Sequence, residues 1–243
     1  VVETTASEDY ETVTREVGVG AAEYLLRVLD PADTIAISWG GSLLGMVNAL
    51  ETATRSRPTT GRAVAQALGG LGNPNHEVHA SDLTRRLARI INAEALILPA
   101  PGVAGTRAAG RALQQDPNVQ STLSLAAQAR LAFMGIGAPR KDSILIQNGT
   151  IVAWEELARL ERQGAVGDIN LRYFDRHGRH VASELDSRVV GLNLTEIKGI
   201  KTVVGVAGGA AKLAAIQGAL AGRLVDVLVT DHITAHHLLE ETD

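Results

Sequence analysis

The feature that most constrains the fold is an alternation of short apolar runs with helical patterns along the 243-residue chain. Runs such as 34–38 and 202–206 are followed by stretches in which apolar residues recur at spacings of three and four, typical of one helical face. This alternation predicts a parallel sheet with helices on both faces. We therefore predict a Rossmann-like α/β fold, an open and mostly parallel sheet with a smaller irregular lobe at about 139–195.

The sequence predicts the elements as follows. Strands are expected over 34–38, 62–68, 95–98, 131–135, 168–175, 202–206 and 225–230. Helices are expected over 9–29, 43–54, 77–92, 106–114, 117–129, 151–163, the stretch after Gly209, and 231–240. No internal repeat or low-complexity linker interrupts this pattern, so a single domain over 1–243 is expected.

Composition excludes several classes of function. A net charge of −4 without a basic run argues against a surface that coats nucleic acid. The absence of cysteine excludes disulfides, thiolate metal sites and a cysteine nucleophile, and it fits a cytoplasmic protein. No uncharged apolar stretch approaches the ~18 residues of a membrane span. The chain opens on Val1, so we expect it to be a fragment that lacks an N-terminal part.

The stretch 203–220 combines a β-branched strand, a glycine turn and a helical pattern. Gly208 and Gly209 form the turn, and Lys212 follows in the first helical turn. This geometry directs backbone N–H groups and the positive helix end toward an anion. It matches neither G-x-x-x-x-G-K-[ST] nor G-x-G-x-x-G, so neither nucleotide motif is present. Either the lysine binds a phosphate here, or the glycines only connect strand to helix.

Other expected strands also end in glycine-rich loops. In open α/β sheets, ligands bind at the carboxyl ends of the strands near the topological switch point. Several such loops on one edge would surround a small ligand with backbone donors, although each alone is ordinary turn chemistry. The loop residues we single out are Gly40, Gly41, Ser42, Gly69, Gly102, Gly135, Gly137, Gly208 and Gly209.

The order of these motifs resembles the effector-binding domain of the SorC family of bacterial transcriptional regulators, from about Asp9 onward. The segments that carry the resemblance are SWGGSL at 38–43, VAQALGG at 64–70, LPAP at 98–101, GIG at 135–137, AVGDI at 165–169, RYFD at 172–175, AGG at 207–209 and VLVTD at 227–231. No one of these segments is specific, but their order and spacing are.

The resemblance implies a fold similar to that of glucosamine-6-phosphate deaminase and ribose-5-phosphate isomerase. It also implies that the chain binds a phosphorylated sugar effector without turning it over, and that it assembles as a homo-dimer or homo-tetramer. We predict no cofactor. Family members carry an N-terminal helix-turn-helix that reads operator DNA. We expect that part to be missing here, so operator binding is implied for the parent protein only.

Carried over by position, Gly40, Gly41 and Ser42 would form one anion-binding loop, and Gly208, Gly209 and Lys212 the other. The chemistry of three further side chains suits a sugar phosphate. The amide of Gln66 can bind sugar hydroxyls, the carboxylate of Asp168 can accept two of them, and Arg172 can bind a phosphate in bidentate fashion. Gln66 could instead bond neighbouring backbone, and Asp168 and Arg172 could form a structural pair.

Lysine and histidine offer further candidates. Lys141 could contact phosphate or form an imine with an open-chain sugar, but we predict no imine and favour a solvated loop lysine. His232 and His236 have the i, i+4 spacing of a metal pair without a supporting third ligand, so no metal site is predicted. His76 and His79 flank a helix start, and His79 could reach the carboxyl edge.

The alternative function is a sugar-phosphate isomerase or deaminase of the same fold. An enzyme of this kind needs a general base placed over the substrate. The carboxylates near the loops are Asp168 and Asp231, and the sequence pairs neither with a proton-relay histidine. Thr230 and Asp231 are also explained as the start of the last helix, with an acidic residue at its positive end. We therefore predict no catalytic residue and favour an effector-binding domain.

Overall fold

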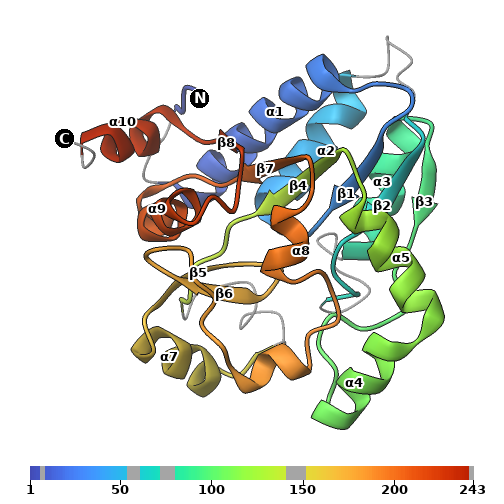
Figure 1. Cartoon of the computed structure of the whole chain (residues 1–243). Helices are drawn as coiled ribbons and strands as arrows, with labels where there is room; N and C mark the ends of the chain where they lie inside the picture. Colours follow the sequence, from blue (N-terminus) through green and yellow to red (C-terminus); the bar gives the residue numbers. More distant parts are fainter. Residues whose placement is uncertain (6–8, 54–60, 72–79, 141–151, 241–243) are drawn as a thin grey trace.

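The computed structural model describes residues 1–5, 9–53, 61–71, 80–140 and 152–240. A six-stranded sheet forms its centre, with strand order β3-β2-β1-β4-β7-β8 and every neighbouring pair parallel (Figure 1). The strands are β1 (Thr34–Ile37), β2 (Ala63–Gln66), β3 (Glu94–Leu96), β4 (Leu131–Gly135), β7 (Thr202–Val206) and β8 (Val227–Val229). The predicted open parallel α/β sheet is confirmed.

Helices cover both faces of this sheet (Figure 1). One face carries α1 (Tyr10–Val28), α2 (Gly41–Ala53) and α3 (Ala80–Ile90); the other carries α5 (Pro117–Ala127), α8 (Leu194–Lys198) and α9 (Leu213–Ala221). The remaining helices are α4 (Arg107–Gln115), α7 (Trp154–Arg162) and α10 (His232–Glu240), with short 3-10 turns at Glu184–Ser187 and Ala210–Lys212.

Alternation of side-chain size along the strands gives the two faces different cores. Ile35, Ile37 and Phe133 point to the cluster beneath α1, α2 and α3, whereas Ala36 and Ala132 point to the opposite cluster. Because successive strand residues face opposite sides, the large residues form one thick apolar layer. The small residues leave room for α5, α8 and α9 on the other side.

The segment predicted as one strand over 168–175 is a hairpin instead, so that prediction was wrong. It consists of β5 (Ala165–Ile169) and antiparallel β6 (Arg172–Asp175), outside the main sheet. Asn170 and Leu171 form the turn with φ of 57° and 58°. Positive φ at both central positions defines the type I′ hairpin turn, which Asn-Gly usually supplies. Because leucine stands in the second position, where glycine is usual, the sequence does not indicate this turn.

Further differences concern element ends and one helix that was missed. The strand predicted over 62–68 ends at Gln66, and Leu68 pairs separately with Gly191. The helix after Gly209 starts as a 3-10 turn. Helix α8 was not predicted, although its capping box, Asn193 followed by Glu196, is a recognisable start signal. The predicted helices over 77–92 and 151–163 begin outside the described residues.

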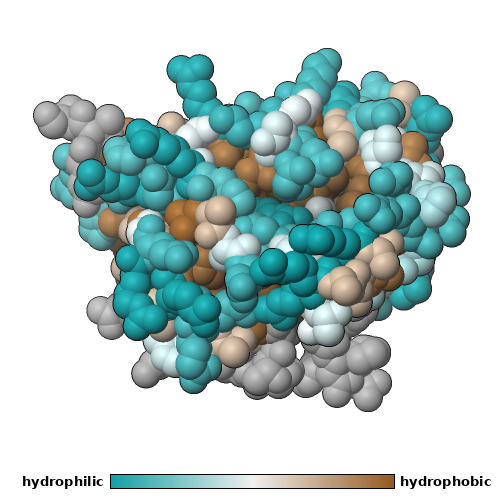
Figure 2. Space-filling view, turned by 60° about the horizontal axis from the view of Figure 1, so that its bottom comes forward, coloured by the Kyte–Doolittle hydropathy of each residue, from teal (hydrophilic) through white to brown (hydrophobic). Residues whose placement is uncertain are grey.

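Hydrophilic residues dominate the face that Figure 2 brings forward, and hydrophobic residues show mainly in the gaps between them.

A third apolar cluster lies beneath α7 and the hairpin, and it includes Leu157, Leu160, Leu171 and Tyr173. The hairpin packs against α9, where a Cβ on Gly167 would lie 2.6 Å from the Cβ of Ala215. The hairpin is therefore held between α9 and the cluster beneath α7.

Replacing Gly178 tests the close approach between the hairpin's end and α9. Its φ is +69°, and a Cβ there would lie 2.3 Å from the Cα of Gly222; Gly164 has φ +92° with no atom within 4 Å. Gly164→Ala should cost about 1 kcal/mol from backbone strain alone. Gly178→Ala should cost about 2 kcal/mol more from overpacking, measured as the free energy of unfolding in urea. Equal losses in the two variants would contradict the close contact.

Candidate functional site

The order of the strands reverses between β1 and β4, which defines the topological switch point. From β1 the chain builds outward to β2 and β3, and from β4 it builds the other way to β7 and β8. The loops after β1 and β4 meet at this point. A Cβ on Gly135 would lie 3.0 Å from the carbonyl oxygen of Trp39, so glycine permits their contact. Open α/β sheets bind ligands in this crevice.

The loop after β1 leads into the N-terminus of α2. Gly40 has φ +126° with no atom within 4 Å of a built Cβ, so this glycine is required by backbone conformation and not by space. The first hydrogen bond of α2 runs from the N–H of Leu44 to Gly40 O, at 2.9 Å. The amides of Gly41, Ser42 and Leu43 therefore have no partner within the helix. Such amides form an anion-binding site.

The loop after β7 has a different arrangement. The N–H of Gly209 donates to Asp231 Oδ2 at 2.8 Å and to Thr234 Oγ1 at 2.9 Å. This predicted phosphate donor is therefore engaged within the protein. Lys212 ends the following 3-10 turn, and its Nζ lies 5.7 Å from the ring centroid of Tyr10, a cation–π distance. In this loop the lysine, and not the amide of Gly209, is the group suited to an anion.

Asp168 lies beside Gly137. The two residues exchange backbone hydrogen bonds of 2.9 and 3.1 Å, and a Cβ on Gly137 would lie 2.2 Å from Asp168 Oδ1. Only glycine leaves room for this carboxylate. Burial raises the pKa of Asp168 to about 6, against the opposing effects of the Leu171 N–H bonded to Oδ2 and of the positive Lys212. Of the predicted site residues, Asp168 thus contacts Gly137 directly and is affected by the charge of Lys212.

Tyr173 stands opposite Asp168 in the hairpin, and sequence reading did not single it out as a site residue. Its hydroxyl is buried and has no hydrogen-bond partner among the described residues. Burial raises its pKa well above the usual value, and the negative charges of Asp168 and Glu156 add to this. A buried hydroxyl without a partner is rare in proteins. Only the pairing of Tyr173 with Asp168 in the hairpin places this hydroxyl at the candidate site.

Gln66 adopts the structural role that was its alternative interpretation. Its Nε2 donates to Leu68 O at 2.6 Å, and its Oε1 accepts from Ser81 Oγ and the Leu98 N–H, both at 3.2 Å. The side chain is completely buried. Its amide ties the end of β2 to the chain after β3, and a contact with ligand stays a prediction.

Gly69 and Gly102 lie near the same strand ends, where β2 and β3 lead into their loops. The N–H of Gly69 donates to Val190 O at 2.9 Å, and that of Gly102 donates to Gly70 O at 2.7 Å. A Cβ on Gly69 would lie 2.6 Å from Ala100 O. Both glycines thus serve close backbone packing.

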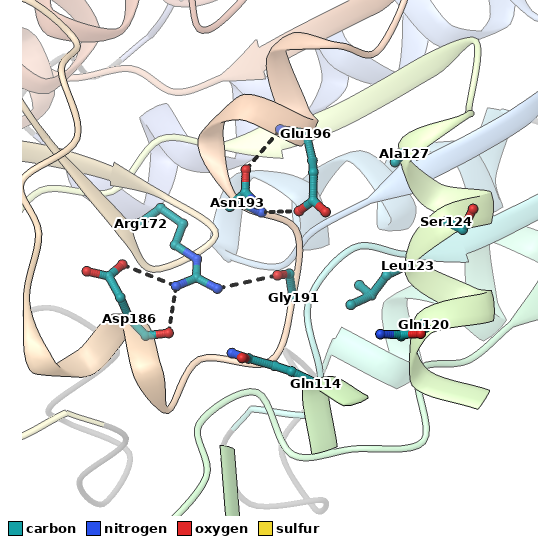
Figure 3. A pocket seen from close by; sticks show the side chains of 10 residues that line it. All are labelled: Gln114, Gln120, Leu123, Ser124, Ala127, Arg172, Asp186, Gly191, Asn193 and Glu196. Carbon is teal, nitrogen blue, oxygen red and sulfur yellow. Dashed lines mark hydrogen bonds and ion pairs between the residues drawn. The ribbon is translucent and has the colours of Figure 1, made fainter. Parts of the chain in front are cut away.

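Arg172 lies on the other face of the hairpin from Asp168 and lines a groove of about 590 Å³ (Figure 3). Its guanidinium bonds the carbonyl and carboxylate oxygens of Asp186 at 2.9 and 3.1 Å, and the carbonyls of Val189 and Gly191. Helix α5 provides the opposite wall. The expected aspartate–arginine pair therefore exists, but its aspartate is Asp186 and not Asp168.

The described residues contain no group of three or more potential metal ligands. His232 Nδ1 accepts the N–H of Thr4 at 3.2 Å, and His236 Nε2 lies 3.1 Å from Glu240 Oε1, so both have protein partners. In the part of the chain that is described, no helix combines the length and apolar character needed to cross a membrane. Lys141, His76 and His79 lie outside the described residues.

Comparison with known proteins gives the family. Residues 1–240 match the family model described as “Putative sugar-binding domain”. The chain is 27% identical over 233 residues to the deoxyribonucleoside regulator of Bacillus subtilis (96% of this chain, 72% of that protein). It is 33% identical over 228 residues to the transcriptional regulator LsrR of Escherichia coli K12 (91% and 67%).

Solved structures agree. The full-length sorbitol operon regulator SorC from Klebsiella pneumoniae superposes with a TM-score of 0.86 at 25% identity, covering 98% of this chain and 75% of that one. A probable sor operon regulator from Shigella flexneri gives 0.79 at 26% identity, with 98% and 92% covered. The chain belongs to this family of sugar-binding domains of SorC-type transcriptional regulators. It spans between 66% and 72% of the length of the curated relatives above and of LsrR from Enterobacter.

Substituting Asp168 tests the electrostatics of the site without any ligand. The folded pKa of about 6 exceeds the usual 3.8, so folding favours the neutral acid. The stabilising contribution of that acid is complete below pH 4 and is lost as pH rises through about 6. Asp168→Asn should therefore be about 2–3 kcal/mol more stable than wild type above pH 6, with the difference vanishing near pH 4.

Asp175 serves as the control, because hydrogen bonds from the amides of Arg179 and His177 lower its pKa. Its contribution is present at neutral pH and lost in acid, so Asp175→Asn should lose stability at neutral pH only. Urea unfolding between pH 4 and 8 measures both. A stability gain in Asp168→Asn that is independent of pH would contradict the buried, ionisable carboxyl.

Proposed function

We propose that the crevice between β1 and β4 binds a phosphorylated sugar, which acts as the effector of a transcriptional regulator. The observation that carries the proposal is the combination of helix amides at Gly41 and Ser42, which have no partner within α2, with Asp168 and with Lys212, whose charge acts on Asp168. Amides at a helix N-terminus and an ammonium group suit a phosphate. A carboxylate suits hydroxyl groups, which donate hydrogen bonds to it.

The phosphate is assigned to the N-terminus of α2, with Lys212 as its counter-charge. Asp168 is assigned to sugar hydroxyls, because a buried carboxylate gains strong hydrogen bonds from donors that replace water. Its pKa of about 6 leaves it mostly ionised at neutral pH and so able to accept two hydroxyl protons. The site thus has a cationic part for phosphate and an anionic part for the sugar.

The names of the relatives support the regulatory role. The Bacillus subtilis protein is named a deoxyribonucleoside regulator, and the Klebsiella pneumoniae protein a sorbitol operon regulator. We infer that the parent protein of this chain binds operator DNA through a part outside these residues and works in the cytoplasm as a dimer or tetramer. Effector binding would then shift the population of DNA-binding states.

The relatives named above are regulators and not enzymes, which agrees with an effector-binding domain. Among the described residues, the carboxylate of Asp168 accepts a hydrogen bond from the N–H of Leu171 and from no histidine. An isomerase or deaminase would need a base that relays protons. Turnover of a bound sugar phosphate would therefore overturn the proposal.

The proposal predicts ligand-dependent stabilisation that requires Lys212. In thermal-shift titrations, at least one of glucose 6-phosphate, fructose 6-phosphate, fructose 1,6-bisphosphate, ribose 5-phosphate and 2-deoxyribose 5-phosphate should raise the melting temperature, and the free sugars should not. Lys212→Ala should weaken that binding about tenfold or more, as expected for the loss of a charged contact.

Lys201→Ala is the matched control, because it removes the same charge at the opposite end of β7, next to Thr202. It should leave the affinity unchanged, and isothermal calorimetry measures both variants. Equal weakening by the two substitutions would indicate a general charge effect and remove the assignment of Lys212. Borohydride trapping of a covalent sugar adduct would contradict the predicted absence of an imine.

A further inference from the structure

Asp231 lies at the turn between β8 and α10 and is 2% exposed. Its Oδ1 accepts the N–H of Thr234 at 2.8 Å, which makes it the cap of α10, as its place in the sequence suggested. Its Oδ2 accepts the Thr234 hydroxyl at 2.7 Å and the Gly209 N–H at 2.8 Å. Burial opposes ionisation, but these bonds outweigh it and lower the pKa of Asp231.

The contact with the glycine loop is close as well as hydrogen-bonded. A Cβ on Gly208 would lie 2.4 Å from Asp231 Oδ2. Gly209 has φ +91°, a backbone conformation that residues other than glycine rarely adopt. The carboxylate therefore fixes the path of the loop between β7 and Lys212. Without this acceptor, the Gly209 N–H would keep only the bond to Thr234.

The N-terminal segment, residues 1–5, docks on the other side of the same turn, and Figure 1 shows the N-terminus near α10. The Val2 N–H donates to Thr230 O at 2.9 Å, and the His232 N–H donates to Val2 O at 2.8 Å. These bonds form a parallel bridge between Val2 and Asp231. The Thr4 N–H donates to His232 Nδ1 at 3.2 Å, which anchors the segment a second time.

Asp231 thus joins two distant parts of the chain. Its side chain accepts the Gly209 N–H, and its neighbours Thr230 and His232 bond the backbone of Val2. We propose that Asp231 is a positioning residue that orients the Gly208–Gly209 loop and couples it to the docking of the N-terminal segment. The ligand consequence rests on the phosphosugar site proposed above. An anion that binds through Lys212 favours the held loop, and it thereby favours the docked segment.

Coupling of this kind is reciprocal. If a held loop favours the docked segment, then a loosened segment must loosen the loop by the same factor. The loop and the segment share no direct hydrogen bond among those of the described residues, because Gly209 bonds Asp231 and Thr234 while Val2 bonds Thr230 and His232. Helix α1 also contacts both, since Val2 lies against Gly20 and the loop lies against Val13 and Val17. A substitution of the Asp231 side chain is therefore needed to identify the β8–α10 turn as the route.

Amide hydrogen exchange, followed by NMR on the whole chain, tests the coupling without a ligand. Val2→Pro removes the N–H that bonds Thr230 O. We expect the Gly209 amide to exchange about fivefold faster or more, the lower end of typical coupling factors. Glu3→Pro is the control, because no bond from the Glu3 amide is found among the described residues. The proposal would be overturned if the Gly209 amide exchanged at the wild-type rate in Val2→Pro, or if Glu3→Pro increased that rate equally.

Asp231→Asn tests the coupling in the opposite direction, from the loop to the segment. The substitution keeps the shape of the side chain and removes its negative charge. The amides of Val2 and Thr4 should then exchange about fivefold faster, although neither bonds the substituted side chain. If only the amides of Gly209 and Thr234 change, Asp231 acts as a local cap and the proposal fails.

Inorganic phosphate serves as the ligand probe. When it slows exchange in the α2 amides of Gly41 and Ser42, it should also slow exchange at Val2 and Thr4. Phosphate that protects the α2 amides and leaves Val2 unchanged would refute the coupling. If phosphate protects neither, the proposed phosphate site fails instead, and the proline and asparagine variants decide the coupling alone.

Discussion

The parallel arrangement of the six strands is the constraint on which the rest of this structure depends. Because all strands run the same way, all of their carboxyl ends meet at one edge, together with the N-termini of the helices that follow them. The reversal of strand order between β1 and β4 opens that edge at one point. Residues far apart in sequence, such as Gly41 and Gly135, are brought to it by the sheet and not by local preferences.

Burial of charge distinguishes the candidate site from the supporting structure. Asp33 is bonded by the guanidinium of Arg130, which lowers its pKa against the effect of burial. Arg172 is likewise bonded by Asp186 and by backbone carbonyls. Among the described residues, Asp168 has one amide bond and no cation within ion-pair distance, and burial raises its pKa. Such an arrangement is typical of binding sites, where stability is given up for interaction with a ligand.

The two glycine loops that looked alike in sequence have different physical roles. At α2 the helix amides lack partners within the helix, so the backbone itself offers the donors that suit an anion. After β7 the amide of Gly209 is held by Asp231, and the loop presents Lys212 instead. Backbone donors engaged within the protein fix geometry, whereas unengaged donors are available to a ligand. In the proposed coupling, Asp231 connects the candidate site to the N-terminal segment.

The sequence by itself determined the parallel α/β architecture and the family, because apolar periodicity and the order of glycine loops depend only on local pattern. It also brought Gly137, Asp168 and Lys212 forward as site residues. It could not show the hairpin turn at Asn170 and Leu171, which lacks the usual glycine.

Only the tertiary structure decided which polar groups are already satisfied. Gln66 bonds Leu68, Ser81 and Leu98, and Arg172 turns to Asp186 on the far face of the hairpin, because neighbouring β positions point to opposite sides. Whether a donor or a charge is free for a ligand depends on partners distant in sequence, and spacing along the chain carries no information about them.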